Sequence, residues 1–476
     1  MKKEQLDYQN EKTGFFAGAN KAVIAFVCAF LVTVSIGGVA LLSMKAGKTT
    51  KTVEADVFEE ETVAARLPFS EKRSDDIGGT ADVSLQGEAT AADNALADGE
   101  NDTEIVASEE TAEGSGESGD ESQNDESSEG ADDAGEAVES TGETYISGAN
   151  WEYNITPANS DYVSLAFAGD ILFDPGYAIM NKIRQNGGGI EGVIGGSLLS
   201  YMRGADIMVV NNEFPYSNRG TPIEGKTFTF RADPSSAALL NQMGVDVATL
   251  ANNHAYDHGE QALLDTLSTL DSVGVARIGA GANLEEASHP VYYTSSNGIK
   301  IAIISATEIE RIDNPDTRGA TDTSPGVFRC LDITKLLSRI KEAKAAGAYT
   351  IVCIHWGTEN DETIDWWQQK QGPEIIAAGA DLIVGAHPHI LQKIGYIDGV
   401  PVIYSLGNFL FNSKDLNTGL LRVNIYTDGH TGLQFVPCVQ SGCTVNEATG
   451  ERKTAILNHM REMSPGVALD ENGFIQ

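Results

Sequence analysis

Residues 250–259 read Leu250-Ala-Asn-Asn-His-Ala-Tyr-Asp-His-Gly259, and the rest of the chain is interpreted outward from this stretch. It follows a short apolar run at 245–250 and precedes a helix-like period that begins near Glu260. The stretch therefore reads as a loop between a strand and a helix, which is where ligands bind in α/β sheets. Turn formation explains single Asn and Asp residues. Two amides, two imidazoles and a carboxylate within seven residues also indicate a binding site.

Four other predicted strands also end on side chains that bind metal ions in proteins. The apolar runs at 163–168, 205–210, 349–354 and 381–385 are followed by these candidates: Asp170, Glu213, His355, and His387 with His389. Helix-like periods separate the runs, at 234–243, 260–272, 332–346 and 365–378. This alternation predicts an α/β fold with much parallel sheet.

Tight-turn sequences interrupt the alternation and predict antiparallel pairs. Asn297-Gly298 separates apolar runs at 291–294 and 299–304, and Asp428-Gly429 separates runs at 421–426 and 433–436. We therefore expect mixed sheets, or two packed sheets with helices outside.

The candidate ligands suggest a metal centre. Any one of them alone is more often a turn residue, a helix cap or a buried imidazole, but five strand ends with the same property favour a shared site. Carboxylate, amide and imidazole ligands together suit Mn, Zn or Fe, whereas Ca and Mg prefer oxygen. We expect one or two divalent ions, held by Asp170, Glu213, Asn253, His355, His387 and His389. Beside the ligand Asn253, His254 is placed to protonate a leaving group.

The first 50 residues predict a membrane anchor. Residues 22–44 carry no charge and lie between Lys21 and Lys45. At about 1.5 Å per residue such a helix crosses a hydrocarbon core of about 30 Å. We expect a single-pass anchor in the cell membrane, with residues 1–21 in the cytoplasm and the C-terminal domain extracytoplasmic. A cleaved signal peptide is the alternative, although its apolar region is normally shorter.

A strongly acidic segment follows the predicted anchor. Residues 51–150 hold 29 acidic and four basic side chains, among many Ser, Gly and Ala residues. Residues 45–150 are therefore predicted to form a disordered acidic linker. It leads to a folded domain at 151–444 and a weakly patterned C-terminal extension at 445–476. The net charge of −37 excludes nucleic acid as an expected partner.

Five cysteines are present, and no two of them have C-x-x-C spacing. Cys438 and Cys443 are close enough in sequence to close a small disulfide loop in an extracytoplasmic domain, and the sequence leaves this open.

Six short motifs occur in order along residues 161–415. They are Gly169-Asp170, Asn211-Asn-Glu213, Ala251-Asn-Asn-His-Ala-Tyr-Asp-His-Gly259, His355-Trp-Gly-Thr-Glu359, Gly385-Ala-His-Pro-His389 and Tyr404-Ser-Leu-Gly-Asn-Phe409. The series resembles the CapA family of poly-γ-glutamate capsule biosynthesis proteins, which is similar in fold to calcineurin-like metallophosphoesterases. The resemblance implies a metallophosphatase-like αββα sandwich with mixed sheets.

The resemblance also implies roles for individual residues. The six metal ligands named above match motif positions, His254 takes the place of the phosphoesterase acid, and Asp257 orients the loop. Glu359 and Asn408 match motif positions without a clear chemical role and are candidate substrate contacts, as is Arg231. One departure concerns the phosphoesterase pattern Asp-x-His, because Leu172 stands at its third position. We therefore expect one of two metal sites to be weak or empty.

The function implied is the synthesis, export or anchoring of a surface polymer, and the polymer expected first is poly-γ-glutamate of a capsule. The expected partners are the cell membrane through residues 22–44, the anionic polymer and other capsule-synthesis membrane proteins. Two alternatives stay open: a metal-dependent phosphoesterase acting on a cell-envelope phosphate ester, and a non-catalytic module that binds polymer or partners. His254 favours an enzyme. Leu172, which stands where the phosphoesterase pattern has a histidine, favours the non-catalytic binding module.

Overall fold

The computed structural model describes residue 145, residues 147–309 and residues 317–476. The predicted anchor at 22–44 and the linker up to residue 144 lie outside these residues. Within the described residues, no helix has the length and apolar character needed to cross a membrane.

The first of two large sheets is mixed and has seven strands in the order β1-β7-β8-β10-β11-β13-β12. Its strands are β1 (Glu152–Ile155), β7 (Val291–Ser295), β8 (Lys300–Thr307), β10 (Tyr349–His355), β11 (Leu382–Ala386), β12 (Ile394–Ile397) and β13 (Val400–Ile403). Strands β7 and β8 form the antiparallel hairpin predicted from Asn297-Gly298. The central strands β8, β10 and β11 are parallel, so β10 and β11 end at one edge of the sheet.

The second sheet has nine strands, and its central path runs β17-β16-β15-β2-β3-β4-β5. Its strands are β2 (Tyr162–Ile171), β3 (Ile207–Asn212), β4 (Val247–Thr249), β5 (Ala276–Ile278), β14 (Asn408–Leu410), β15 (Leu416–Tyr426), β16 (Thr431–Ser441), β17 (Thr444–Glu447) and β18 (Phe474–Ile475). Strands β2, β3, β4 and β5 are parallel, and β14 also runs parallel to β2. Strands β15 and β16 form the second predicted hairpin. A separate pair joins β6 (Ala280–Gly281) to β9 (Gly326–Val327).

The helices of the described residues are α2 (Ala178–Gln185), α3 (Gly196–Gly204), α4 (Ala238–Met243), α5 (Gly259–Ser272), α6 (Leu284–Ala287), α7 (Thr334–Ala345), α8 (Trp366–Ala378) and α9 (Gly450–Met463), with short 3-10 helices η1 (Ile190–Gly192) and η2 (Pro234–Ala237). The four predicted helical periods correspond to α4 with η2, α5, α7 and α8, and the structure adds α2, α3, α6 and α9. Helix α8 begins at a capping box, in which Asp365 accepts from the backbone of Gln368 and the Gln368 side chain accepts from the backbone of Asp365. Gly379 in left-handed conformation ends it.

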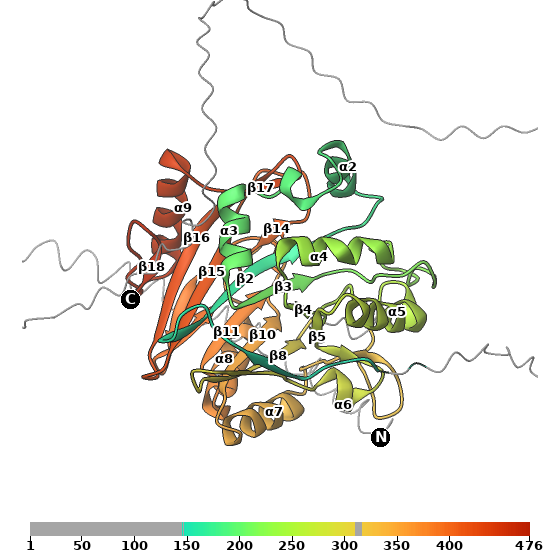
Figure 1. The fold of residues 1–476 in the computed structure, drawn as a ribbon, viewed down its shortest axis with the longest axis horizontal. Coiled ribbons are helices and arrows are strands. Elements are labelled where there is room, and N and C mark those ends of the chain that lie inside the picture. The colour runs from blue at the N-terminus through green and yellow to red at the C-terminus, as the bar shows by residue number, and fades with distance from the viewer. Residues whose placement is uncertain (1–144, 146, 310–316) are drawn as a thin grey trace, which may run out of the picture. The chain divides into compact units, whose positions relative to one another are not determined.

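Two sheets pack face to face with helices on both outer sides. Because side chains alternate along a strand, Leu165 and Phe167 of β2 enter the core shared with Ile351 of β10. The intervening Ala166 of β2 packs in the core beneath helices α3, α4 and α5. A third core joins the outer face of the first sheet to α7 and α8. Figure 1 shows these helices on opposite sides of the paired sheets. The predicted mixed α/β fold with two packed sheets is confirmed.

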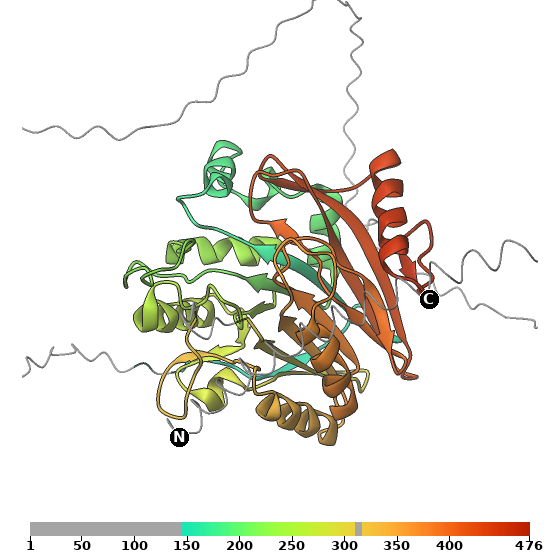
Figure 2. The same ribbon diagram turned by 180° about the vertical axis from the view of Figure 1, so that it is seen from behind.

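Residues 444–476 are built into the second sheet. Strands β17 and β18 pair with β16, and Ile456 of α9 packs in the core between the sheets. Figure 2 shows α9 beside the C-terminal strands. The disulfide that the sequence left open is not formed, because Cys438 and Cys443 are both buried free cysteines.

Candidate metal centre

The candidate ligands meet where strands of both sheets end. Asp170 lies on β2 and Glu213 directly follows β3, both in the second sheet. His355 is the last residue of β10 and His387 directly follows β11, both in the first sheet. Since the two sheets face each other, these strand ends bring ligands from segments far apart in sequence into one buried cluster.

The first subsite joins Glu213, His355 and His387, whose ligand atoms all lie within 4.8 Å of one another. His355 Nε2 lies 3.1 Å from His387 Nδ1 and 2.9 Å from the amide oxygen of Asn253. It also lies 3.5 Å from Glu213 Oε1. Four groups with lone pairs thus converge on one point, which is the arrangement a divalent cation requires.

The second subsite joins Asp170, Glu213 and His389 within the same limit. His389 Nδ1 lies 3.1 Å from Asp170 Oδ2 and 2.9 Å from the amide oxygen of Asn408. Asn211 donates from its amide nitrogen to the other oxygen of Asp170 at 2.7 Å. Asp170 is thereby held with one oxygen directed at His389.

Glu213 belongs to both subsites, and its environment tests whether a cation fits. Its side chain is completely buried, yet neither carboxylate oxygen has a hydrogen-bond partner. A buried carboxylate without hydrogen bonds is costly unless it is paired or coordinates a metal. The donor set around it, three imidazoles, a second carboxylate and an amide, is one that Mn, Zn and Fe accept. The cluster therefore has the groups needed to hold a divalent ion.

The backbone at the histidine motif is also unusual. His387 has φ of 100° and His389 has φ of 61°, on either side of Pro388. Residues other than glycine rarely adopt positive φ, and such strain concentrates at functional sites. The strain lets two histidines two residues apart face different subsites, His387 the first and His389 the second.

Burial and charges within the cluster shift three pKa values strongly. Burial raises the pKa of Glu213, but His389, His355 and His254 outweigh it and lower that pKa to about 2. Burial lowers the pKa of His389, but Glu213 and Asp170 outweigh it and raise that pKa to about 10. His387 has a pKa well below its usual value, because it is buried and faces the other imidazoles. The cluster without metal thus places positive charge on His389 beside two carboxylates.

A proton-transfer pair lies next to the first subsite. His254 Nδ1 lies 2.7 Å from Asp257 Oδ2, which leaves Nε2 as the ring nitrogen able to exchange a proton. The same Asp257 oxygen accepts from the backbone of Phe230 at 2.7 Å, and the Phe230 ring lies over His254 with centroids 4.2 Å apart. Lys226 donates to Asp257 Oδ1 at 2.6 Å and to the carbonyl of Asn253.

The other predicted site residues lie in different surroundings. Asn408 is buried against His389, whereas Glu359 is exposed and reaches the cluster only through its charge on His389. Arg231 directs its guanidinium to the carbonyl oxygens of Arg219 and Gly220, at 3.4 and 3.5 Å. The structure thus brings Asn408 into the cluster and leaves the Arg231 guanidinium outside it.

Three residues that sequence reasoning missed support the cluster. Lys226 is a single lysine in a loop, and no sequence signal separates it from an exposed lysine. Asn211 and Asn252 stand inside the quoted motifs, so their position was a usable signal. Asn252 donates to Asn211 Oδ1 at 3.2 Å and accepts from the backbone of His254 at 3.1 Å. These bonds tie the end of β3 to the loop after β4.

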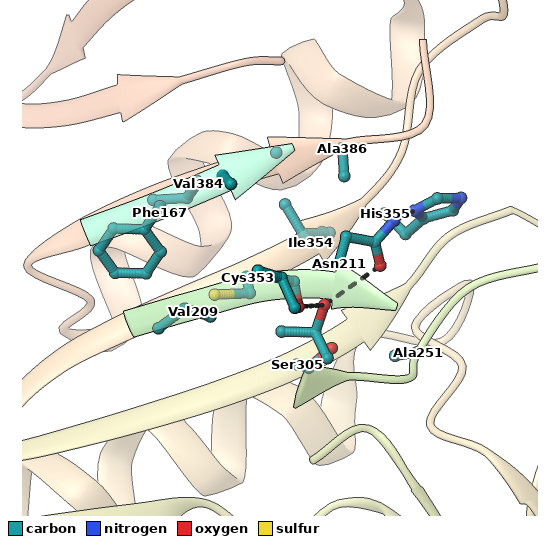
Figure 3. A pocket seen from close by; sticks show the side chains of 14 residues that line it. Phe167, Val209, Asn211, Ala251, Ser305, Cys353, Ile354, His355, Val384 and Ala386 are labelled. Atoms are coloured by element: carbon teal, nitrogen blue, oxygen red, sulfur yellow. Dashed lines mark hydrogen bonds between the residues drawn. The ribbon is translucent and has the colours of Figure 1, made fainter. Parts of the chain in front are cut away.

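A small cavity lies between the sheets directly behind the cluster. Its walls include Phe167 and Val209 from the second sheet and Cys353 and Val384 from the first. Asn211 and His355 lie at one end of it (Figure 3), with Asn211 Nδ2 3.4 Å from His355 Nδ1. Asp170 and His355 thus stand on packed strands, and the other candidate ligands lie in the segments that follow β3, β4 and β11.

Comparisons with known proteins agree with the motif series. The model of the family described as "Bacterial capsule synthesis protein PGA_cap" matches residues 164–413. The "PGA biosynthesis protein CapA" of Bacillus subtilis (strain 168) is 28% identical over 290 residues, which span 59% of this chain and 72% of that protein. The "Capsule biosynthesis protein CapA" of Bacillus anthracis is 28% identical over 254 residues, which span 51% of this chain and 60% of that protein.

Two further comparisons are more distant. A "Probable polyglutamine synthesis accessory protein" of Mycobacterium tuberculosis is 26% identical over 216 residues, which span 43% of this chain and 55% of that protein. The crystal structure of the protein TT1561 of Thermus thermophilus aligns with a TM-score of 0.31 and 9% identity, over 55% of this chain and 94% of that chain.

Proposed function

Since the chain belongs to the bacterial capsule synthesis family PGA_cap, we propose that it takes part in the synthesis, export or anchoring of a poly-γ-glutamate capsule. The relatives from two Bacillus species carry names that state a role in capsule or PGA biosynthesis. The proposal extends that role to this chain and assigns it to the metal centre of a metallophosphatase-like sandwich.

The observation that carries a metal-dependent role is the state of Glu213. It is fully buried, lacks hydrogen bonds and lies in two ligand triads at once. We propose that the cluster would hold two divalent ions, one through Glu213, Asn253, His355 and His387 and the other through Glu213, Asp170 and His389. Mn, Zn and Fe are the candidate metals.

The residues around the ions define what chemistry the site performs. A divalent cation supplies Lewis-acid polarisation of a substrate oxygen. His254 Nε2 donates a proton to the leaving group, and Asp257 holds the imidazole so that Nε2 is the atom presented. Lys226 balances the charge of Asp257, because its ammonium lies 2.6 Å from the carboxylate. The reaction class is therefore hydrolysis or transfer at a phosphoryl or acyl centre.

The proposed place of action rests on the sequence of residues 22–44. We propose that residues 22–44 anchor the chain in the cell membrane by one pass and that the folded domain works outside the cytoplasm, next to the polymer and other capsule-synthesis membrane proteins. Sedimentation of the full chain with membranes that resists high salt and alkali would support this proposal. Release of an intact chain by carbonate would rule it out.

The proton-transfer pair His254 and Asp257 favours a second function, that of a phosphoesterase. A histidine oriented by an aspartate beside a shared carboxylate serves phosphoesterase chemistry as well, so a phosphate ester of the cell envelope is the alternative substrate. A third function, in which the domain only binds polymer or partners without catalysis, requires neither metal nor His254.

The decisive experiment measures metal content and substrate use on the same samples. The full chain, purified in detergent, is compared with the double variant His387→Ala/His389→Ala. Each is assayed by elemental analysis, by chain-length analysis of added poly-γ-glutamate, with α-linked polyglutamate as control, and with an aryl phosphodiester.

Each outcome selects one function. Metal in the wild type, lost in the variant together with shortening or transfer of the γ-linked polymer alone, supports the capsule role. Metal-dependent turnover of the phosphodiester alone supports the phosphoesterase. A folded wild type that binds no added metal contradicts the metal centre and leaves a polymer-binding module.

A further inference from the structure

The motif Tyr404-Ser-Leu-Gly-Asn-Phe409 has no role in the function proposed so far, although Asn408 lies inside the cluster. Strand β14 begins at Asn408 and runs parallel to β2, with Asn408 paired to Asp170. The Asn408 side chain is only 3% exposed. A side chain fixed by a sheet ladder, next to a ligand on the neighbouring strand, is held as rigidly as that ligand.

The atoms around His389 Nδ1 show an excess of hydrogen-bond acceptors. Asn408 Oδ1 lies 2.9 Å from this nitrogen and Asp170 Oδ2 lies 3.1 Å from it. A carboxylate oxygen of Glu213 belongs to the same group of ligand atoms. One ring nitrogen carries at most one hydrogen, so it cannot satisfy three oxygen groups together. More oxygen lone pairs converge here than there are hydrogens to bond them, and such an arrangement suits a cation.

The same region lacks the ligand that the phosphoesterase pattern places two residues after Asp170. Leu172 stands there, fully buried in the core beneath the helices, and its backbone donates to the carbonyl of Leu410 on β14 at 2.9 Å. The side chain at that position is therefore directed away from the cluster. Without another donor, the second subsite holds three ligands against four in the first.

We propose that the amide oxygen of Asn408 is the fourth ligand of the second subsite and replaces the absent histidine. Each subsite then has four protein ligands, shares Glu213 and includes one asparagine, Asn253 in the first and Asn408 in the second. The second subsite has the set Asp170, Glu213, His389 and Asn408. This inference rests on the proposed metal centre and deepens it.

The test counts metal ions in the full chain at saturating Mn²⁺, by elemental analysis after removal of free metal. Asn408→Leu removes the ligand oxygen and keeps the size of the side chain. Asn408→Asp keeps an oxygen at the same place and covers the case in which the leucine variant fails to fold. The matched control is Asn412→Leu. Asn412 accepts at 2.8 Å from Gln440 Nε2 near the same strand, outside both subsites.

We expect two ions in the wild type, in Asn408→Asp and in Asn412→Leu, and one ion in Asn408→Leu. The absorption spectrum of the Co²⁺-loaded protein gives a second readout, because a lost ligand changes its intensity and a merely structural role does not. Rescue by aspartate with a changed Co²⁺ spectrum identifies direct ligation.

Failure of this inference differs from failure of the proposed function. Two ions with unchanged affinity and spectrum in Asn408→Leu overturn the inference and leave the metal centre intact. If the wild type binds one ion and Asn408→Leu still binds it, the inference is also overturned and the metal centre stays intact. If Asn408→Leu loses that ion, the result supports Asn408 as a ligand. A wild type that binds no ion contradicts the metal centre itself.

Discussion

At the scale of single residues, the cluster depends on buried charges that compensate one another. Asp257 is fully buried and receives three donors, from His254, Phe230 and Lys226. Lys226 is itself 5% exposed at its side chain. Neither member of the Lys226–Asp257 pair is exposed enough to be screened by solvent, so the loss of either leaves an uncompensated buried charge.

Replacing Lys226 by Met should therefore lower the free energy of unfolding by about 3 kcal/mol, because Asp257 loses its cation. Lys226→Arg keeps the charge and should recover most of this loss. Chemical denaturation of the full-length variants at pH 7 measures both. Equal stability of Lys226→Met and wild type would show that the ion pair contributes nothing.

A second prediction concerns Asp246, whose carboxylate accepts from the backbone of Met208 at 2.7 Å. Burial, opposed by this bond and helped by Asp206, raises its pKa from 3.8 to about 6. Between these values the folded chain holds a proton that the unfolded chain has lost, so stability falls as pH rises from about 4 to 6. The full loss is about 3 kcal/mol for a shift of roughly two pH units.

Asp246→Asn cannot ionise, so its free energy of unfolding should decline less than that of the wild type over the same range. Denaturation midpoints at pH 4, 5, 6 and 7 give the two slopes. Parallel curves for the two proteins would remove Asp246 as the source of the pH dependence.

At the scale of elements, close approach of the backbone positions the ligand on β2. A Cβ atom at Gly169 would lie 1.8 Å from the carbonyl oxygen of Gly407, just before β14. The next residue, Asp170, donates its backbone N–H to that same oxygen at 3.2 Å. Glycine at 169 thus lets β2 and the start of β14 lie close enough for Asp170 and Asn408 both to approach His389 Nδ1.

Gly169→Ala should cost about 3 kcal/mol through this clash and should weaken metal binding, because the strands must separate. Gly196→Ala is the matched control. Apart from its chain neighbours and its own helix backbone, no heavy atom lies within 4 Å of its added Cβ, and Gly196 begins α3. Its stability should stay within about 1 kcal/mol of the wild type. Thermal melts with and without Mn²⁺ compare the two; equal behaviour would refute the role given to Gly169.

A second element holds one edge of the sandwich together. Tyr145 and residues 147–155, here called the N-terminal strap, contact edges of both sheets. Within the strap, β1 pairs with β7 of the first sheet. Arg277 of β5, an edge strand of the second sheet, donates to Ser147 Oγ at 3.2 Å and also to Asp271 and Glu286. The Arg277 side chain is fully buried.

Arg277→Met should therefore destabilise the full chain by about 3 kcal/mol or more, because two carboxylates lose their buried partner. Arg203→Met is the control: its partner Glu191 is exposed, so solvent screens the pair and the loss of stability should be small. Denaturant titrations of both variants measure the loss in free energy of unfolding relative to the wild type. A loss no larger than that of Arg203→Met would show that the strap does not depend on Arg277.

At the scale of the whole molecule, the candidate metal cluster lies between two sheets that otherwise meet through an apolar core. His355 and His387 come from the first sheet, and Asp170, Glu213 and Asn253 from the second. An ion held by both sheets binds only the folded chain, so it should stabilise the fold by about 2.7 kcal/mol at a concentration about one hundred times its dissociation constant.

Adding EDTA should therefore lower the thermal midpoint of the wild type, and excess Mn²⁺ should restore it. Glu213→Gln, which removes the shared carboxylate, should respond to neither. Differential scanning calorimetry on the full chain provides the comparison. If neither EDTA nor Mn²⁺ changes the thermal midpoint of the wild type, the prediction that a cation links the two sheets is contradicted.

Much of this architecture was readable from short stretches of sequence. Apolar runs predicted β2, β3, β10 and β11, and turn dipeptides predicted the hairpins, because strand and turn preferences depend on neighbouring residues. The identity of the ligand candidates also followed, since a polar side chain directly after a buried strand is a local feature. The stretch at 250–259 identified the loop that carries Asn253, His254 and Asp257.

Only the tertiary structure decided how these residues combine. Sharing of Glu213 between two triads depends on the order of strands and on the packing of one sheet against the other, which are long-range. The same holds for Lys226 against Asp257 and for Asn408 against Asp170, two pairs whose members are distant in the chain. Sequence alone determined which groups stand at the strand ends; the packing of two sheets determined which of them face each other, because distance in space is set by burial of apolar faces and not by position along the chain.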